Sequence, residues 1–92
     1  MTEAVNGRTT PDTWFVYIVQ CADDTLYTGV AKNINKRLHE HNHTGRGARY
    51  TRSRRPVRLV YSESAADRSH ACRREYAIKQ FSRQDKIHLI EG

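Results

Sequence analysis

The tightest constraint on the fold of this chain is a pair of neighbouring apolar segments separated by a polar turn. Residues 14–21, Trp-Phe-Val-Tyr-Ile-Val-Gln-Cys, are rich in the aromatic and β-branched side chains that favour extended backbone. Residues 26–30, Leu-Tyr-Thr-Gly-Val, have the same character, and the polar residues Ala22-Asp-Asp-Thr25 between them are typical of a turn. Two strands this close in sequence predict an antiparallel hairpin.

Tyr17 and Tyr27 occupy the two strands of this hairpin, and the length of the connection decides whether they share a face. Residues alternate between faces along a strand, and directly paired residues of neighbouring strands share a face. The two tyrosines therefore share a face only if the connection has an odd number of residues or contains a bulge. A regular two-residue turn at Asp23-Asp24 would separate them. We expect a three- or five-residue connection.

The remainder of the chain alternates helical and extended patterns. Ile34 and Leu38 follow helical spacing over about residues 33–42, and Thr44-Gly-Arg-Gly47 ends that helix and opens a long basic loop. A third strand is expected over residues 57–61, extending toward Ser64. A second helix should begin at a cap, Asp67 or Ser69, and run to about Phe81.

The last predicted element is a short helix capped by Ser82, with Asp85 in its first turn and Ile87 and Ile90 as its apolar residues. The order β-β-α-β-α-α predicts an α+β fold, a small sandwich in which helices flank a three-stranded antiparallel sheet. Residues 1–13 are polar and without periodicity, and we expect a flexible lead-in there. Residues 14–92 then form one domain, since 92 residues suffice for one small domain.

Positive charge is concentrated in the middle of the chain. There are 16 Lys and Arg against 10 Asp and Glu. Nine of the cations fall between residues 32 and 58, where Glu40 is the one acid. A cluster that spans a helix, a loop and a strand suits a surface that follows phosphates, so nucleic acid is the expected partner.

The sequence has no apolar run near the roughly 20 residues that cross a bilayer, and its N-terminus lacks the apolar core of a signal peptide. Cys21 and Cys72 lack metal-ligand spacing and are expected to be reduced thiols. These features predict a cytoplasmic protein without a membrane partner. Nothing in the sequence indicates an obligate protein partner.

The chain resembles the GIY-YIG nuclease family, most closely its small stand-alone YhbQ-type branch. The likeness spans about residues 14–90. It rests on the two strand segments above and on Arg37-Leu38, Glu40-His-Asn42, Gly47-Ala-Arg-Tyr-Thr-Arg52, Arg54-Arg-Pro56 and Arg74-Glu75. The resemblance implies the GIY-YIG fold and a metal-dependent nuclease that hydrolyses phosphodiester bonds at a shallow basic face, with DNA preferred over RNA. A role in DNA repair is the pathway expected by analogy.

The resemblance also assigns roles to single residues. It implies that Tyr17, Tyr27, Arg37, His41 and Glu75 are catalytic, that Glu75 binds one Mg²⁺ or Mn²⁺ ion, and that Gly29 belongs to the structural motif. One carboxylate suffices for Mg²⁺, which keeps most of its waters. Arg37 offers a planar fork of donors to a phosphate. Tyr27 would orient or deprotonate the attacking water, with Tyr17 or His41 assisting.

The chain departs from the family pattern at two places. Phe15 stands where the first half-motif usually begins with glycine, and Val30 stands where some relatives have lysine, with Lys32 two residues later. A larger set of residues is expected to bind the nucleic acid: Lys32, Lys36, Arg49, Tyr50, Arg52, Arg54 and Arg55.

Two alternatives remain open at this point. The first is a module of the same fold that binds nucleic acid but cuts it poorly or not at all. The second is a zinc site, because His39-Glu-His-Asn-His43 places histidines with the spacing that zinc proteases use on a helix. That helix ends at once after His43, and no third ligand is evident.

Overall fold

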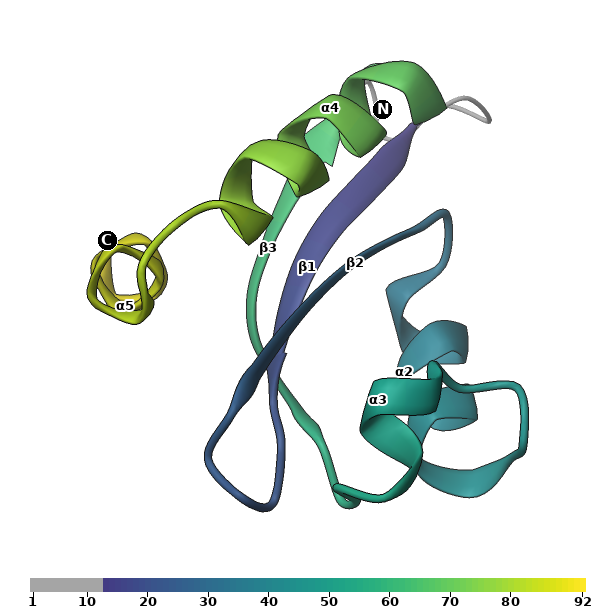
Figure 1. The fold of residues 1–92 in the computed structure, drawn as a ribbon. Helices are drawn as coiled ribbons and strands as arrows, with labels where there is room; N and C mark the ends of the chain where they lie inside the picture. The colour runs from purple at the N-terminus through teal and green to yellow at the C-terminus, as the bar shows by residue number, and fades with distance from the viewer. Residues whose placement is uncertain (1–12) are drawn as a thin grey trace.

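A three-stranded antiparallel sheet forms the centre of the molecule (Figure 1). The computed structural model describes residues 13–92. Strands β1 (Trp14–Gln20) and β2 (Leu26–Ala31) form the predicted hairpin, and β3 (Arg58–Ala65) pairs with the other edge of β1. The order is therefore β2-β1-β3, and β1 is the central strand. Its middle residues, Val16 to Val19, are all buried because the sheet has neighbours on both faces.

The hairpin connection has the predicted odd length. The last strand pair is Gln20 with Leu26, and the Cys21 amide donates to the Thr25 carbonyl at 2.8 Å, so three residues form the tip. Asp24 has φ 67°, a left-handed conformation that closes such a tip. Tyr17 pairs with Gly29 and Val19 pairs with Tyr27. Both tyrosines consequently lie on one face of the sheet, as predicted.

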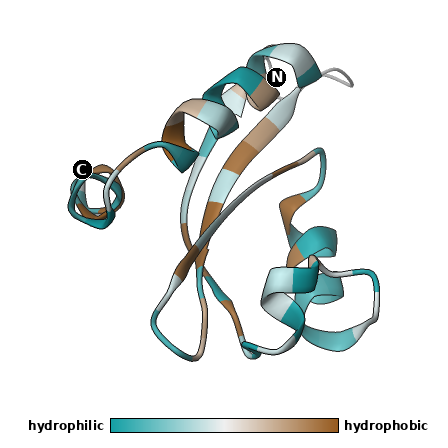
Figure 2. Ribbon diagram, viewed as in Figure 1, coloured by the Kyte–Doolittle hydropathy of each residue, from teal (hydrophilic) through white to brown (hydrophobic). Residues whose placement is uncertain are grey.

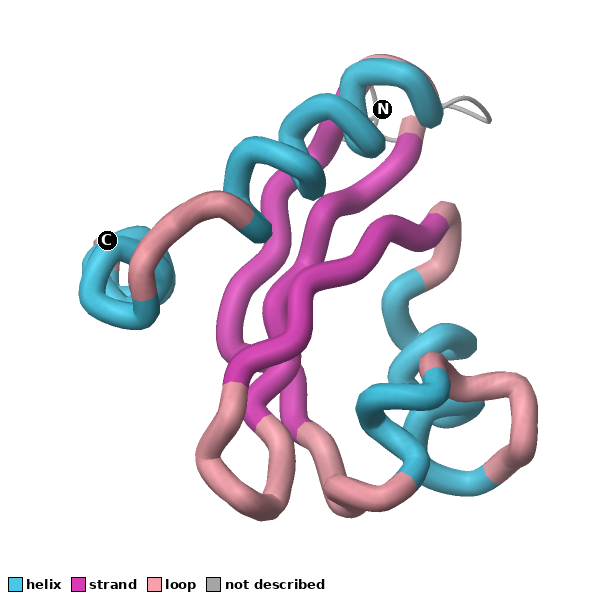
Figure 3. The backbone as a smooth tube through the Cα atoms, viewed as in Figure 1, coloured by secondary structure: helices cyan, strands magenta, loops and turns pink. Residues whose placement is uncertain are grey.

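The two faces of the sheet carry separate halves of the core. Tyr17, Val19 and Cys21 point to the face covered by α2 (Ile34–His43), whose Ile34 and Leu38 pack against them. The opposite face is covered by α4 (Arg68–Lys79) and α5 (Arg83–Glu91) (Figure 3). On that side Val16 and Ile18 of β1 contact Ala71 and Ile78 of α4. Because both faces of β1 are covered, hydrophobic residues follow one another along this strand with little interruption (Figure 2).

The helices begin at the residues that the sequence marks as caps. The side chains of Asn33, Asp67 and Ser82 each accept a hydrogen bond from a backbone amide in the first turn of α2, α4 and α5. Of the two residues considered as the cap of α4, Asp67 and Ser69, the structure has Asp67. The predicted α+β fold class, a helix-flanked three-stranded antiparallel sheet, is confirmed.

The predicted element order lacked one element. The segment expected to be a continuous basic loop contains a short helix, α3 (Arg49–Arg52), so the observed order is β-β-α-α-β-α-α. Four residues are too few for a periodic pattern, and no side chain caps α3 at Ala48. Thr51 anchors this helix by being fully buried against α2.

Both cysteines, Cys21 and Cys72, are free thiols. In residues 13–92 no helix is long and apolar enough to cross a bilayer. All but the last residue of the expected flexible lead-in, residues 1–13, lies outside the described residues.

Candidate active site

A buried hydrogen-bond chain links β1 to α2 and α3. The Tyr17 hydroxyl lies 2.7 Å from His41 Nε2, and His41 Nδ1 lies 2.8 Å from Thr51 Oγ1. The Thr51 hydroxyl donates to the Ala48 carbonyl at 2.9 Å. His41 and Thr51 are fully buried and Tyr17 is 2% exposed. This series of hydrogen bonds is therefore shielded from water along most of its length.

The directions of these hydrogen bonds follow from the single proton of the Thr51 hydroxyl. That proton goes to the Ala48 carbonyl, so Thr51 Oγ1 can only accept from His41 Nδ1–H. His41 Nε2 then carries the lone pair and accepts from the Tyr17 hydroxyl. The Ala48 amide also points at Nδ1, but at 3.4 Å it is the longest of these contacts. We therefore assign the Nδ1–H tautomer, in which Tyr17 is the donor.

Burial keeps both members of the tyrosine–histidine pair uncharged at neutral pH. Burial, and after it the charge of the nearby Arg37 guanidinium, lowers the pKa of His41 from 6.5 to about 4. Burial also raises the pKa of Tyr17 from 10.0 to about 12, against the effect of Arg37 and with contributions from Tyr27 and Glu75. Tyr17 is consequently a phenol and His41 a neutral imidazole.

The buried neutral imidazole predicts a specific loss of stability in mild acid. In the unfolded chain His41 takes up a proton near its ordinary value of 6.5, whereas in the folded chain it does so only near 4. Between these values the unfolded state binds more protons, so the free energy of unfolding falls as the pH decreases and is fully recovered above the upper value. Urea denaturation across this window measures the slope.

The matched variant for this measurement is His41→Gln, which cannot titrate. We expect it to show a smaller pH slope than the wild type between about pH 6.5 and 4.5. Carboxylates with lowered pKa values, such as those of Asp23 and Glu40, titrate below that window. Equal slopes for the two proteins would contradict the assignment of a neutral buried His41.

Gly29 allows the Tyr17 ring to reach His41. A β-carbon at Gly29 would lie 2.5 Å from the Tyr17 hydroxyl oxygen and 2.7 Å from Cζ, far inside contact distance. The phenol ring therefore crosses directly over the backbone of β2 at this residue. The sequence motif identified Gly29, and the structure gives the physical reason for a residue without a side chain there.

We expect Gly29→Ala to displace the Tyr17 ring and to lower the free energy of unfolding by roughly 1–3 kcal/mol, the usual cost of overpacking. Thermal or urea denaturation measures the loss. Gly45→Ala is the control, because nothing lies within 4 Å of a β-carbon there. The account of Gly29 is wrong if both substitutions change stability equally.

Tyr27 lies beside the buried hydrogen bonds of Tyr17, His41 and Thr51, but its own side chain remains half-exposed. Its ring meets the His41 ring edge-on at 5.7 Å and stacks on the Tyr50 ring at 5.9 Å. Within residues 13–92 no hydrogen bond holds the Tyr27 hydroxyl, in contrast to that of Tyr17. The Tyr27 oxygen is therefore the free phenol oxygen of the site.

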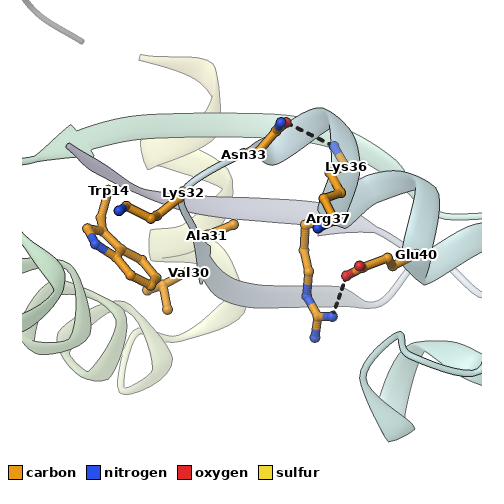
Figure 4. Close-up of a pocket in the computed structure, with 8 residues that line it drawn as sticks. All are labelled: Trp14, Val30, Ala31, Lys32, Asn33, Lys36, Arg37 and Glu40. Atoms are coloured by element: carbon orange, nitrogen blue, oxygen red, sulfur yellow. Dashed lines mark hydrogen bonds and ion pairs between the residues drawn. The ribbon is translucent and has the colours of Figure 1, made fainter. Parts of the chain in front are cut away.

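Arg37 projects from α2 with its guanidinium fixed by two acceptors. Arg37 Nη1 donates to Glu40 Oε1 at 3.0 Å (Figure 4). It also donates to the Arg46 carbonyl at 2.8 Å. The side chain stays 30% exposed. Nη1 makes the hydrogen bonds to Glu40 and to the Arg46 carbonyl, and the guanidinium also lies within hydrogen-bonding reach of the Tyr17 hydroxyl. A guanidinium carries five N–H donors, so donors remain for an anion such as a phosphate.

Glu75 reaches the same region from α4. Its Oε2 lies 3.4 Å from Lys79 Nζ, and that amino group lies 5.7 Å from the centroid of the Tyr27 ring. The carboxylate also contributes to the raised pKa of Tyr17. Tyr27, Arg37 and Glu75 are therefore all close enough to Tyr17 to affect its pKa, and the buried His41 contacts Tyr17 directly.

The expected nucleic-acid-binding residues divide into two groups. Lys32, Lys36, Arg49, Tyr50 and Arg52 are exposed. Arg54 instead bonds to Asp23 and to the Tyr50 carbonyl, and its guanidinium covers the Tyr50 ring at 3.9 Å. Arg55 donates to the carbonyls of His41 and Thr44 and thereby ties down the end of α2.

The donor set of the site suits one hard divalent cation better than zinc. Among residues 13–92 no three His, Cys, Asp or Glu side chains gather as a metal-binding group. His39 and His43 are exposed, and their ring centroids lie 4.7 Å apart with the planes tilted by 35°. The lone Glu75 carboxylate, 22% exposed, fits Mg²⁺, which binds through one or two carboxylates and otherwise keeps water.

Thr51 is the site residue that the sequence reasoning missed. It lies in the segment Gly47-Ala-Arg-Tyr-Thr-Arg52, which shows the family resemblance, but a threonine in a basic loop carries no local signal of burial. Only the position of α3 against His41 reveals its role in fixing the imidazole.

Comparison with known proteins gives a consistent result. The family model described as GIY-YIG catalytic domain matches residues 13–88. A UPF0213 protein of Desulfotalea psychrophila is 63% identical over 79 residues, which are 86% of this chain and 72% of that protein. A UPF0213 protein of Staphylococcus aureus strain Mu3 is 54% identical over 80 residues, covering 87% and 96% of the two chains. The solution NMR structure of a UPF0213 protein from Bacillus halodurans has a TM-score of 0.55 and 38% identity, covering 86% of this chain and 83% of that one.

Proposed function

The chain belongs to the GIY-YIG family, and we propose that it is a nuclease that hydrolyses phosphodiester bonds in DNA with the help of one divalent cation. The observation that carries the proposal is the meeting of two tyrosines, one arginine and one glutamate from four elements at a basic face. Phosphodiester hydrolysis needs an oriented water, neutralisation of phosphoryl charge and stabilisation of the leaving oxygen.

Glu75 is the residue that would hold the cation. A bound Mg²⁺ or Mn²⁺ would neutralise charge on the phosphate and make a coordinated water more acidic. Lys79 pairs with Glu75 at 3.4 Å. RNA is the less favoured substrate in this proposal.

Arg37 binds the phosphate that is cleaved. Its Nη1 is occupied by Glu40 and the Arg46 carbonyl, which fixes the plane of the guanidinium before the substrate arrives. The N–H donors that are not used by Glu40, the Arg46 carbonyl or Tyr17 meet the phosphoryl oxygens. A pre-oriented cation of this kind stabilises the charge that builds up on those oxygens during the reaction.

Tyr27 orients the attacking water through its free phenol oxygen. The water oxygen bonds to phosphorus as the bond between phosphorus and the leaving sugar oxygen breaks. The proton that the water loses passes through solvent water to that sugar oxygen. Tyr17 donates a hydrogen bond to His41 Nε2, and its oxygen lies within hydrogen-bonding reach of the Arg37 guanidinium, so Tyr17 assists by positioning Arg37. His41 and Thr51 act as positioning residues in this scheme, since both are fully buried.

Tyr27→Phe tests the proposal at its water-orienting residue. The substitution keeps the ring between His41 and Tyr50 and removes only the hydroxyl. We expect the single-turnover cleavage rate of labelled DNA in Mg²⁺ to fall roughly 10²-fold, because the attacking water is then no longer held in the orientation for attack. Tyr76→Phe is the control, because Tyr76 is 70% exposed on α4. Equal rates for the two variants would remove Tyr27 from the mechanism.

The same residues also support a second function, a module that binds nucleic acid without cutting it. The exposed cations Lys32, Lys36, Arg49 and Arg52 favour phosphate binding whether or not cleavage follows. Salt-sensitive binding without metal-dependent cleavage is the result that favours this function.

A further inference from the structure

A hollow of about 340 Å³ lies between the end of β2 and the start of α2, next to the site already described (Figure 4). It is lined by Trp14, Val30, Ala31, Lys32, Asn33, Lys36, Arg37 and Glu40. Three of these are cations, and the one acid, Glu40, is paired with Arg37. The lining is therefore an apolar floor with an excess of positive charge at its rim.

The indole ring of Trp14 is the planar surface of this hollow. Lys32 Nζ lies 5.9 Å from the ring centroid, and Arg68 Cζ, from the first residue of α4, lies 5.7 Å from it. Both cations are exposed, and within residues 13–92 neither pairs with a carboxylate. Two free cations from different elements thus converge on one aromatic ring.

These features match one kind of ligand, a planar ring joined to an anion. Aromatic side chains bind unpaired bases by stacking, and flanking Lys and Arg bind the phosphates on either side. The volume is at the lower end of the roughly 300–1,000 Å³ of small-ligand sites, which suits one nucleotide. Arg37 lines the hollow and also lies beside Tyr17, so this residue is shared by the hollow and the cleavage site.

We propose that this hollow is a subsite for one unpaired nucleotide of the substrate strand, with its base on Trp14 and its phosphates on Lys32 and Arg68. The proposal rests on the nuclease function proposed above. Lys32 and Arg68 swing from the ring to the phosphates when the strand binds. When a nucleotide occupies the subsite, the next phosphate of the strand lies close to Arg37.

Trp14 is the single tryptophan of the chain, so its fluorescence reports this subsite alone. The wild-type protein is titrated in EDTA, which prevents metal-dependent cleavage, with a thymidine oligonucleotide, a blunt duplex and an abasic strand of equal charge. Fluorescence anisotropy of end-labelled strands measures binding independently. We expect saturable quenching by the thymidine strand and binding of the abasic strand without quenching. Binding of the thymidine strand without quenching would overturn the subsite, as would equal quenching by the duplex.

Trp14 also packs against the core, so its substitution affects stability as well as any stacking with a base. Paired variants separate these two effects. Trp14→Leu should weaken binding of the thymidine strand about tenfold, whereas Trp14→Phe keeps a stacking ring and should stay within about threefold. Lys32→Ala should weaken binding more than Arg83→Ala, which removes an equal charge from α5 beside a different hollow. Urea denaturation verifies that each variant is folded. Equal losses within either pair would contradict the proposal.

The two proposals can fail separately. Quenching by the thymidine strand without any cleavage in Mg²⁺ would leave the subsite standing and remove the nuclease function. Metal-dependent cleavage that Trp14→Leu leaves unchanged, together with absent quenching, would keep the function and remove the subsite.

Discussion

Replacing Glu75 by glutamine is expected to reduce the rate of DNA cleavage at least about 10³-fold. The substitution keeps the shape of the side chain and removes the one charge that would hold a divalent cation, whose contribution to such reactions is several kcal/mol. Affinity for DNA in EDTA should stay within about threefold, because the surface cations are untouched. Single-turnover cleavage and anisotropy, measured on the same preparation, give the two quantities.

Glu63→Gln is the matched control for this prediction. Glu63 is 26% exposed and pairs with Arg74 of α4 at 2.8 Å, whereas Glu75 is 22% exposed and pairs with Lys79 of the same helix at 3.4 Å. The two variants therefore lose the same charge from similar surroundings. Cleavage by Glu75→Gln within tenfold of the control would remove Glu75 as the metal-binding residue.

Replacing Arg37 by alanine is expected to have an effect of similar size, roughly 10³-fold on the cleavage rate. Arginine residues that stabilise the charge of a transferring phosphoryl group contribute about 10³–10⁵ in rate. Arg37→Lys should recover only part of the loss, because lysine offers one point charge in place of a planar fork. The lysine variant also cannot satisfy Glu40 and the Arg46 carbonyl while it meets a phosphate.

Arg46→Ala is the control for Arg37. It removes a neighbouring exposed cation but keeps the carbonyl that Arg37 uses. A uniform loss of affinity in both variants, with no extra loss of rate in Arg37→Ala, would make Arg37 a surface cation only. A full recovery in Arg37→Lys would contradict the argument from the planar fork.

The hairpin was predictable because strand geometry has a period of two. The identity of the strands and the parity of their connection were enough to place Tyr17 and Tyr27 on one face, and the register confirms it. Gly29 was recognised from the motif, but the crossing of the Tyr17 ring above it needed coordinates.

The surroundings of His41 could not be predicted from the sequence. His41 lies near the end of a polar helix, where exposure is the usual outcome. It is fully buried because α3, an element without a periodic pattern, covers it and brings Thr51 to its Nδ1. Charge alone likewise could not separate the exposed Arg49 and Arg52 from Arg54 and Arg55, whose donors are used by the backbone and by Asp23.

The most direct test of the nuclease function is cleavage of end-labelled single-stranded, duplex and branched DNA by the wild-type protein in Mg²⁺, in Mn²⁺ and in EDTA. Glu75→Gln, purified in the same way, is run beside it. We expect that at least one of these DNAs is cut, that EDTA stops the cutting, and that the variant binds this DNA without cutting it. Equal residual cutting by both proteins would identify a contaminant, and tight salt-sensitive binding without any cutting would show that this site binds nucleic acid and does not cleave it.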